Sequence, residues 1–389
     1  MMSATWASPD DVPDAAVLSY LRVREGLPEV GRKLAKGPIC VGYLGGRLTM
    51  MKEGWRPMFH TWLNSRFPND RGHRALHVGR GGVGSVSGAF FVQDEICGHD
   101  PDVVFVEYAI NDSYDFLTPP ALRRPAIEGI VRSIRLRHPT AEICLVYMHH
   151  VLRGEEIRAA VEDYESLADH YGLPSIHVGR FLLDRVEEGA WSFRGDGGLP
   201  ALLRDECHPL PEGNRWIADL IAAAFLRLIR AEGSPAPRTL PPACSRAPLV
   251  GGRVIPVDPS MIDGPYELES RKVGNYAAPV TWYALPEGTR LRWRAGPRVF
   301  GLFVVVGPRS GVVRAEAGGD RVEVALLDRW CTYERISTCI LARDGEGLGG
   351  GKGDATIELS PEAPDYAACP KLEDPPSERR LDVVGLFVL

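Results

Sequence analysis

The strongest constraint on the fold is an alternation of two hydrophobic patterns between about residue 37 and residue 232. Short and almost continuously apolar runs are typical of strands that are buried on both faces of a parallel sheet. Longer segments with apolar residues every three or four positions are typical of amphipathic helices. The strand-like runs cover residues 38–44, 75–78, 103–108, 143–148 and 175–178. The helix-like segments cover residues 55–67, 84–97, 120–136, 157–170 and 212–231, after a helical lead-in at 14–35. This order predicts a three-layer α/β/α sandwich with a mostly parallel sheet.

The composition changes abruptly after residue 232. Residues 233–250 contain five prolines, at positions 235, 237, 241, 242 and 248, which predicts an extended linker. From 251 to 389 the pattern is one of short strands, typical of an all-β sandwich. A chain of 389 residues is also too long for one hydrophobic core. We therefore expect a helical lead-in (1–36), an α/β domain (37–232), the linker and an accessory β-sandwich domain (251–389).

Composition excludes several classes of function. The net charge of −6 and the lack of a basic run disfavour nucleic-acid binding. No apolar run approaches 18 residues, and the N-terminal segment lacks the apolar stretch of a secretory signal. The eight cysteines are scattered without a CxxC pair, which indicates free thiols and disfavours zinc. We expect a cytoplasmic protein that has no membrane span, no metal and no cofactor.

The first strand runs into the sequence Gly45-Gly46-Arg47-Leu48-Thr49. Two glycines permit a sharp turn, which brings the next side chain to the carboxyl edge of the sheet. Ligands of open α/β sheets bind at that edge. Arg47 therefore lies where a nucleophile could project.

Later segments provide other parts of an acyl-hydrolase site, which needs a base, an orienting group and oxyanion donors besides a nucleophile. His208 and Asp205, three residues apart, form a base and its orienter, although such a pair is also common in surface turns. Gly82 can present a backbone N–H, or it can simply form a tight turn. Asn111 follows the third strand as an amide donor, unless it or Asp112 caps a helix.

Four sequence blocks, in order over residues 37–232, resemble those of the SGNH (GDSL-type) hydrolase family. GGRLT is similar to the GGSIT of one subfamily. Gly82 lies in a segment similar to its GxGGTGS, and Asn111 in one similar to its FVEFAVND. The last block, DxxH, is formed by Asp205 and His208.

This resemblance implies a flavodoxin-like fold and hydrolysis of an ester or of an O-acylated sugar. It also implies catalytic roles for Gly82, Asn111, Asp205 and His208. Residues 300–303 and 327–330 are similar to the accessory sandwich of some of these proteins. The expected ligand is an acylated carbohydrate or another small ester.

The sequence departs from the family at the nucleophile, where the resemblance places serine and this chain has Arg47. A guanidinium stays protonated, so it cannot attack an acyl group. The hydroxyls of Thr49, Ser85 and Ser87 are poor replacements, and no GxSxG elbow exists. Cys207 adjoins His208, but consecutive side chains usually point apart.

Two interpretations of Arg47 follow. In the first, Arg47 pairs with Asp205 or fills the pocket, and the protein is an inactive pseudoenzyme that binds a glycan or an acidic metabolite. In the second, Arg47 binds an anionic group of the substrate. His208 then activates water, and Gly82 and Asn111 stabilise the developing charge. We favour the second interpretation, an esterase-type hydrolase. A weaker alternative is an interaction scaffold built on the sandwich domain.

Other residues are candidates for contact with the ligand. Arg80 is a possible second anion contact, although the sequence favours a solvated loop residue. His149 and His150 follow the fourth strand, at the expected rim of the site. Trp191 is a candidate lid or sugar-stacking residue, unless it pins its own loop. Three tryptophans of the second domain are expected in its core rather than on a carbohydrate platform: Trp282, Trp293 and Trp330.

Overall fold

The structure, a computed structural model, describes residues 9–233, 239–274, 276, 278–294, 296–342, 347–349 and 354–389. The chain divides into two compact units. The first comprises residues up to 88 together with 92–248, and the second comprises 89–91 and 249–389. Residues 234–238, within the predicted linker, lie outside the described residues.

The first unit is built on a six-stranded sheet with the order β1-β6-β5-β4-β2-β3. Its strands are β1 (Leu21–Arg22), β2 (Cys40–Gly45), β3 (Arg74–Gly79), β4 (Val103–Glu107), β5 (Glu142–Val146) and β6 (Ser175–Ile176). All neighbours are parallel except β1, which pairs antiparallel with β6. The five parallel strands follow the flavodoxin-like order, and the expected fold class is confirmed.

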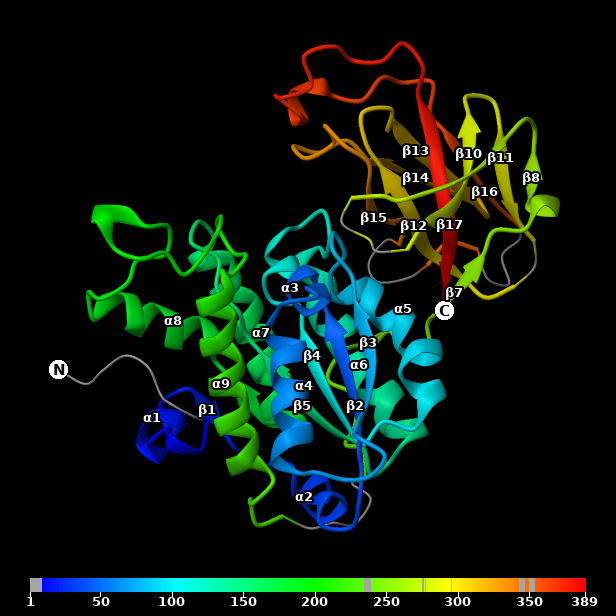
Figure 1. The fold of residues 1–389 in the computed structure, drawn as a ribbon. Helices are drawn as coiled ribbons and strands as arrows, with labels where there is room; N and C mark the ends of the chain where they lie inside the picture. Colours follow the sequence, from blue (N-terminus) through cyan, green and yellow to red (C-terminus); the bar gives the residue numbers. More distant parts are fainter. Residues whose placement is uncertain are drawn as a thin grey trace. The chain divides into compact units, whose positions relative to one another are not determined.

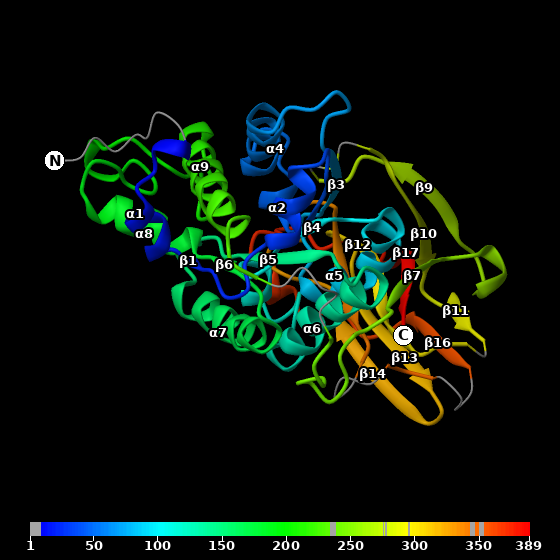
Figure 2. The ribbon, with the colours of Figure 1, turned by 90° about the horizontal axis from the view of Figure 1, so that it is seen from below.

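Helices cover both faces of this sheet, which Figure 2 shows nearly edge-on. One layer contains α1 (Asp14–Ser19), α2 (Pro28–Leu34), α4 (Trp55–Arg66), α8 (Val178–Glu187) and α9 (Pro211–Leu228). The opposite layer contains α5 (Ser85–Glu95), α6 (Pro120–Arg137) and α7 (Gly154–Tyr171). Among the helices that the structure describes, none is both long enough and apolar enough to cross a bilayer.

An aromatic cluster forms the centre of the core between the sheet and the α4–α9 layer. Tyr43 of β2 stacks on Phe105 of β4, with ring centroids 5.9 Å apart. Phe59 of α4 meets Phe105 edge to face at 5.3 Å, and Phe225 of α9 at 5.5 Å. Aromatic side chains bury large apolar areas, so they dominate the hydrophobic free energy of a core. The cluster fixes the two strands whose carboxyl ends form the candidate site.

Two parts of the first unit differ from the sequence-based prediction. The helical lead-in at 14–35 is interrupted, because Arg24 (φ 45°) and Gly26 (φ 61°) adopt the left-handed conformation and Pro28 then begins α2. The interruption contains β1, which extends the main sheet. Helix α8 was not predicted, although the buried Phe181 and Leu182 on one face are typical of an amphipathic helix.

The second unit consists of two antiparallel sheets, so the predicted all-β architecture is confirmed (Figure 1). The larger sheet contains β7 (Arg253–Pro256), β9 (Glu267–Arg271), β10 (Val280–Pro286), β12 (Val299–Val306), β15 (Arg335–Ile340) and β17 (Arg380–Val388). The smaller sheet contains β8 (Ile262–Asp263), β11 (Arg290–Trp293), β13 (Val312–Ala317), β14 (Asp320–Ala325) and β16 (Ala355–Leu359). Strand β12 is buried along its whole length, which explains its continuous apolar sequence.

Several short elements complete the fold. The sequence analysis did not anticipate β7, β8, β9, β13, β15 and β16, most of which are short or rich in charged residues. Helix α3 (Arg47–Met50) belongs to the candidate site. The 3-10 helices are η1 (Pro9–Asp11), η2 (Cys97–His99), η3 (Asn111–Ser113), η4 (Asp196–Gly198), η5 (Pro259–Met261) and η6 (Tyr366–Ala368).

The second half of the predicted linker is fastened to the first unit. Arg132 Nη1 donates to the carbonyl oxygen of Pro241 at 2.8 Å. The backbone N–H groups of Cys244 and Ser245 both donate to the Glu128 carboxylate at 2.6 Å. Residues 241–245 form neither helix nor strand, as their prolines predict, and they are held against α6.

Candidate functional site

The candidate site lies at the carboxyl ends of β2 and β4. The chain leaves β2 toward β3 on one side of the sheet, whereas β4 leads to β5 on the other. In a sheet of this order the loops diverge at this point and leave a crevice, where ligands bind. Arg47 directly follows the turn after β2, and Asn111 follows β4.

Both glycines of the turn after β2 are required by close packing. A Cβ on Gly45 would lie 2.4 Å from Thr49 Oγ1 and 2.8 Å from the Glu107 carbonyl oxygen. A Cβ on Gly46 would lie 2.1 Å from Asn111 Oδ1. The Asn111 side chain therefore packs directly on the backbone that leads into Arg47.

Arg47 and the glycine loop after β3 lie side by side. Arg47 is the first residue of α3 and is half-buried. A Cβ built on Gly81 would be in van der Waals contact with Arg47, 3.6 Å from its Cβ and 3.7 Å from its Cδ. Gly82, next in the chain, has φ +81°, which other residues rarely adopt. The structure thus brings Arg47, Asn111 and this loop together, as the order of the motifs predicts.

Asp205 and His208 form a tightly bonded pair. His208 Nδ1 lies 2.7 Å and 2.8 Å from the two carboxylate oxygens of Asp205. The backbone N–H groups of His208 and Cys207 donate to Asp205 Oδ1 at 2.9 Å and 3.1 Å. Burial raises the pKa of Asp205, but these hydrogen bonds outweigh it and lower the pKa to about 2. An ionised Asp205 only accepts hydrogen bonds, so Nδ1 of His208 carries the proton and Nε2 has the lone pair of a base.

The surroundings of His208 keep its imidazole neutral. Burial lowers the pKa of His208, and the charges of Arg47 and Arg204 lower it further. Asp205 opposes these effects, but the pKa still falls below its usual value. A neutral imidazole at neutral pH is the form that a general base requires.

Replacement of Arg47 by methionine is expected to raise the pKa of His208. The substitution removes a positive charge that disfavours the imidazolium, so the protonated form persists to higher pH. If hydrolysis needs neutral His208, the acid limb of the pH–rate profile should lie at higher pH for the variant than for the unmodified protein. NMR titration of the His208 ring measures the shift directly. Arg80→Met is the matched control, and an equal shift in both variants would contradict the assignment to Arg47.

The hydroxyl groups near the turn are committed elsewhere. Thr49 is fully buried and its Oγ1 donates to Glu107 Oε2 at 2.9 Å. Ser85 Oγ donates to Asp112, and both Ser85 and Ser87 are fully buried. Asp112 Oδ1 also accepts from the backbone N–H of Ser85 at 2.8 Å, so it binds the first N–H group of α5 from a distant part of the chain. None of these three hydroxyls is available as a nucleophile, in agreement with the sequence analysis.

The expectation that Cys207 points away from His208 is wrong. Cys207 Sγ lies 3.7 Å from His208 Nδ1, because Asp205 binds the backbone of both residues and tightens the turn. That ring nitrogen is already held by Asp205. Burial also raises the pKa of the Cys207 thiol to about 12. Cys207 is therefore close to the base without being an activated nucleophile.

Glu107 is a buried acid that the sequence analysis overlooked. It ends β4 with 1% of its surface exposed, and burial raises its pKa to about 8 despite hydrogen bonds from Thr49 and Gly46. Its contact with Thr49 ties α3 to β4 beneath the candidate site. The sequence could have indicated this residue, because Glu107 is the one charged residue of the otherwise apolar strand β4.

The two candidate histidines after β5 have different surroundings. His149 stacks on Phe193 with centroids 4.5 Å apart, and burial and the neighbouring His150 lower the pKa of His149 to about 4. His150 Nδ1 accepts the backbone N–H of Leu152 at 3.2 Å, so its Nε2 donates to the Tyr114 hydroxyl at 2.9 Å. His150 thus joins the loops that follow β4 and β5. Contact of either histidine with a ligand stays a prediction.

The other two candidates contact neighbouring side chains. Arg80 Nη2 lies 2.6 Å and 2.7 Å from the carboxylate oxygens of Glu95 on α5. Trp191 packs edge to face on Trp216 of α9, with centroids 5.1 Å apart. The contact of Trp191 favours its structural alternative, a pinned loop, whereas Arg80 is ion-paired rather than simply solvated. The ligand roles of both residues stay predictions.

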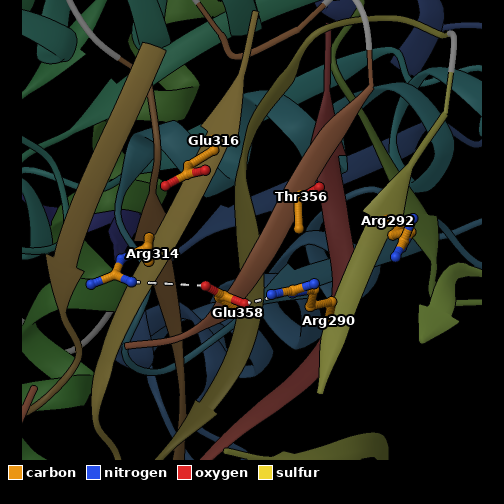
Figure 3. Close-up of a pocket in the computed structure, with 6 residues that line it drawn as sticks. All are labelled: Arg290, Arg292, Arg314, Glu316, Thr356 and Glu358. Carbon is orange, nitrogen blue, oxygen red and sulfur yellow. Dashed lines mark hydrogen bonds and ion pairs between the residues drawn. The ribbon is translucent and has the colours of Figure 1, made fainter. Parts of the chain in front are cut away.

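A cavity of about 330 Å³ lies on the smaller sheet of the second unit (Figure 3). It is lined by Arg290, Arg292, Arg314, Glu316, Thr356 and Glu358. Glu358 stands between Arg290 (2.9 Å) and Arg314 (3.9 Å). Arg292 pairs with Asp263. Because these arginines are matched by acids and the six lining residues include no aromatic side chain, the cavity is best explained as a paired charged face.

The tryptophans of the second unit only partly follow the expected core placement. Trp282 is fully buried. Trp293 is half-buried and donates to the Pro297 carbonyl oxygen at 2.9 Å. Trp330 is also half-buried, and the Arg329 guanidinium lies 4.2 Å from its ring centroid.

Comparisons with known proteins agree with this description. Residues 43–216 match the family described as GDSL-like Lipase/Acylhydrolase. The crystal structure of a two-domain esterase (CEX) active on acetylated mannans is similar with a TM-score of 0.70 and 15% identity, over 96% of this chain and 98% of that one. The same esterase co-crystallized with mannopentaose gives 0.71 and 16%, over 96% and 97%. A search of curated protein sequences gave no match.

The likeness to the esterase covers both units, and at such low identity it concerns the fold alone. The sequence match covers the β2 and β4 turns and the Asp205–His208 pair. The α/β domain of this chain is therefore similar to the GDSL-like lipase/acylhydrolase (SGNH) family over residues 43–216, and a second, all-β domain follows it.

Proposed function

We propose that this protein hydrolyses an ester or an O-acyl group on a carbohydrate, with water activated by His208 in place of a serine nucleophile. The observation that carries the proposal is the Asp205–His208 pair. Its Nδ1 contacts of 2.7 Å and 2.8 Å fix the tautomer in which Nε2 is a base. Burial lowers the pKa of that base, and the charge of Arg47 lowers it further. Arg47 occupies the nucleophile position of the family in this proposal.

Each residue of the site has a role in the reaction. His208 Nε2 removes a proton from water, which attacks the acyl carbon. Asp205 stabilises the imidazolium that forms. The backbone N–H of Gly82 and the amide of Asn111 donate to the carbonyl oxygen as it becomes negative. His208 then returns the proton to the leaving alkoxide, which gives a carboxylic acid and an alcohol.

Arg47 adds a permanent positive charge to this crevice. Its fork can bind a carboxylate or phosphate of the substrate through two parallel hydrogen bonds. The likeness to a mannan esterase over the full chain supports an acylated carbohydrate as the substrate class. We also propose a reducing, cytoplasmic environment, because all eight cysteines are unpaired.

A second candidate function is binding without catalysis. The position of Arg47 favours it, because the stem of this side chain lies on Gly81 and occupies the turn. In that case the crevice recognises a glycan or an acidic metabolite, and the Asp205–His208 pair provides polar contacts.

The experiment that separates these functions measures acetate release from aryl acetates and from acetylated mannan oligosaccharides, with and without a fluorophosphonate. We expect release that the reagent does not reduce, and no covalent adduct by mass spectrometry. Adduct formation by the unmodified protein would show a serine route and contradict the proposal. Glycan binding by calorimetry without any acetate release would instead support the second candidate.

A further inference from the structure

Three different metal-binding side chains converge beside the proposed base. The ligand atoms of Asp205, Cys207 and His208 all lie within 4.8 Å of one another. Among the described residues, this is the one group of three possible metal ligands that lie so close together. A carboxylate, a thiol and an imidazole together are the donor set of zinc-type ions. Asp205 and His208 have 35% and 16% of their side-chain surfaces exposed, so an ion can reach them.

The sulfur–nitrogen separation fits a tetrahedral ion, whereas the oxygen–nitrogen separation has to widen. Usual Zn–S and Zn–N bond lengths place the two donors about 3.6 Å apart, and O and N donors about 3.3 Å apart. Cys207 Sγ and His208 Nδ1 are separated by 3.7 Å. The shorter contact of 2.8 Å between His208 Nδ1 and Asp205 Oδ2 is a hydrogen bond from the Nδ1 proton, and loss of that proton to Nε2 would let the two atoms move apart around an ion. Asp205 Oδ1 remains bound to two backbone N–H groups, which leaves Oδ2 as the ligand.

The local charge also favours a cation. The carboxylates of Asp205 and Glu206 disfavour a bare thiolate at Cys207, whereas the charge of Arg47 favours it. The same negative potential attracts a divalent ion. A coordinated thiol loses its proton to the metal outright, so burial of the free thiol does not prevent binding.

We propose that Asp205 Oδ2, Cys207 Sγ and His208 Nδ1 form a binding site for one soft divalent cation of the Zn²⁺ or Cd²⁺ type, which switches off His208. Binding releases the thiol proton, and the Nδ1 proton moves to Nε2, so the ring stays neutral and one proton leaves. Nε2 then carries a hydrogen toward the crevice and has no lone pair with which to accept a proton from water. The inhibitory consequence rests on the proposed function, whereas the binding does not.

The test is a Cd²⁺ titration of the reduced, chelator-treated protein, followed by the thiolate-to-cadmium charge-transfer absorption in the ultraviolet. We expect one tight equivalent for the unmodified protein. Cys207→Ser should weaken that binding by at least about tenfold and remove the band, since it removes the thiolate ligand. Cys244→Ser is the matched control, because Cys244 is the exposed cysteine and lies far along the chain. It should leave the tight equivalent and its band unchanged.

A second measurement does not depend on any variant. Nitrogen-15 NMR of the His208 ring should show the proton on Nδ1 without metal and on Nε2 with Cd²⁺. A band that persists in Cys207→Ser, a band that disappears in Cys244→Ser, or the absence of a tautomer change would each overturn the proposal. Because these readouts need no substrate, tight binding by a protein that hydrolyses no ester would refute the proposed function and leave the metal site intact.

Discussion

Arg47→Ser is expected to make the protein react with a fluorophosphonate and to raise its turnover of aryl acetates by about 10² or more. The new hydroxyl would begin α3 beside Gly81 and Asn111, and Arg47 is close enough to His208 to affect its pKa. In serine hydrolases, loss of the nucleophile lowers turnover by about 10⁶. The remaining enzyme is still about 10³ to 10⁴ times faster than the reaction in water, because substrate binding and the oxyanion hole are retained. A turn built around arginine should recover only part of that factor.

The measurement is a comparison of labelling and steady-state rates for the unmodified protein, Arg47→Ser and Arg47→Ala. The alanine variant removes the same charge without adding a hydroxyl, so it should stay unlabelled and should not gain the serine-dependent rate. Equal behaviour of the serine and alanine variants would show that position 47 is not a nucleophile position. An unchanged rate for both variants would show that Arg47 takes no part in the hydrolysis of aryl acetates.

His208→Ala is expected to lower the hydrolysis rate of the unmodified protein by about 10² to 10⁴, the usual contribution of a general base. His208 is held as a general base is, with one ring nitrogen between the two carboxylate oxygens of Asp205. The loss should appear in kcat more than in KM, because the proton transfer occurs only in the transition state. Asp205→Asn should reduce the rate as well, because the wrong tautomer of His208 then becomes populated.

Steady-state kinetics on aryl acetates give the comparison, with thermal unfolding to verify the fold of each variant. His170→Ala is the matched control, since His170 is an exposed residue of α7 that bonds the Pro242 carbonyl oxygen. It should keep its activity. A His208→Ala protein that retains most of its rate would place the base elsewhere and refute the water mechanism.

Local patterns in the sequence predicted the architecture. A near-continuous apolar run such as β12 shows from neighbouring residues alone that the strand is buried. The spacing of Trp55 and Phe59 likewise shows which face of α4 is buried. The elements that were missed are those whose pattern is short or polar. Strand β1 has two residues and exists because it pairs with β6, more than 150 positions later. No local pattern can encode that pairing.

The sequence by itself also determined the turn at Gly45–Gly46 and the Asp205–His208 pair, because three residues of chain are enough to bring the carboxylate to the imidazole. Only the tertiary structure decided what surrounds them. The packing of Asn111 on Gly46, the contact of Arg47 with Gly81 and the approach of Cys207 to His208 depend on how strands and turns are placed. Periodicity records which face of an element is buried, whereas contacts between distant segments follow from close packing of the whole core.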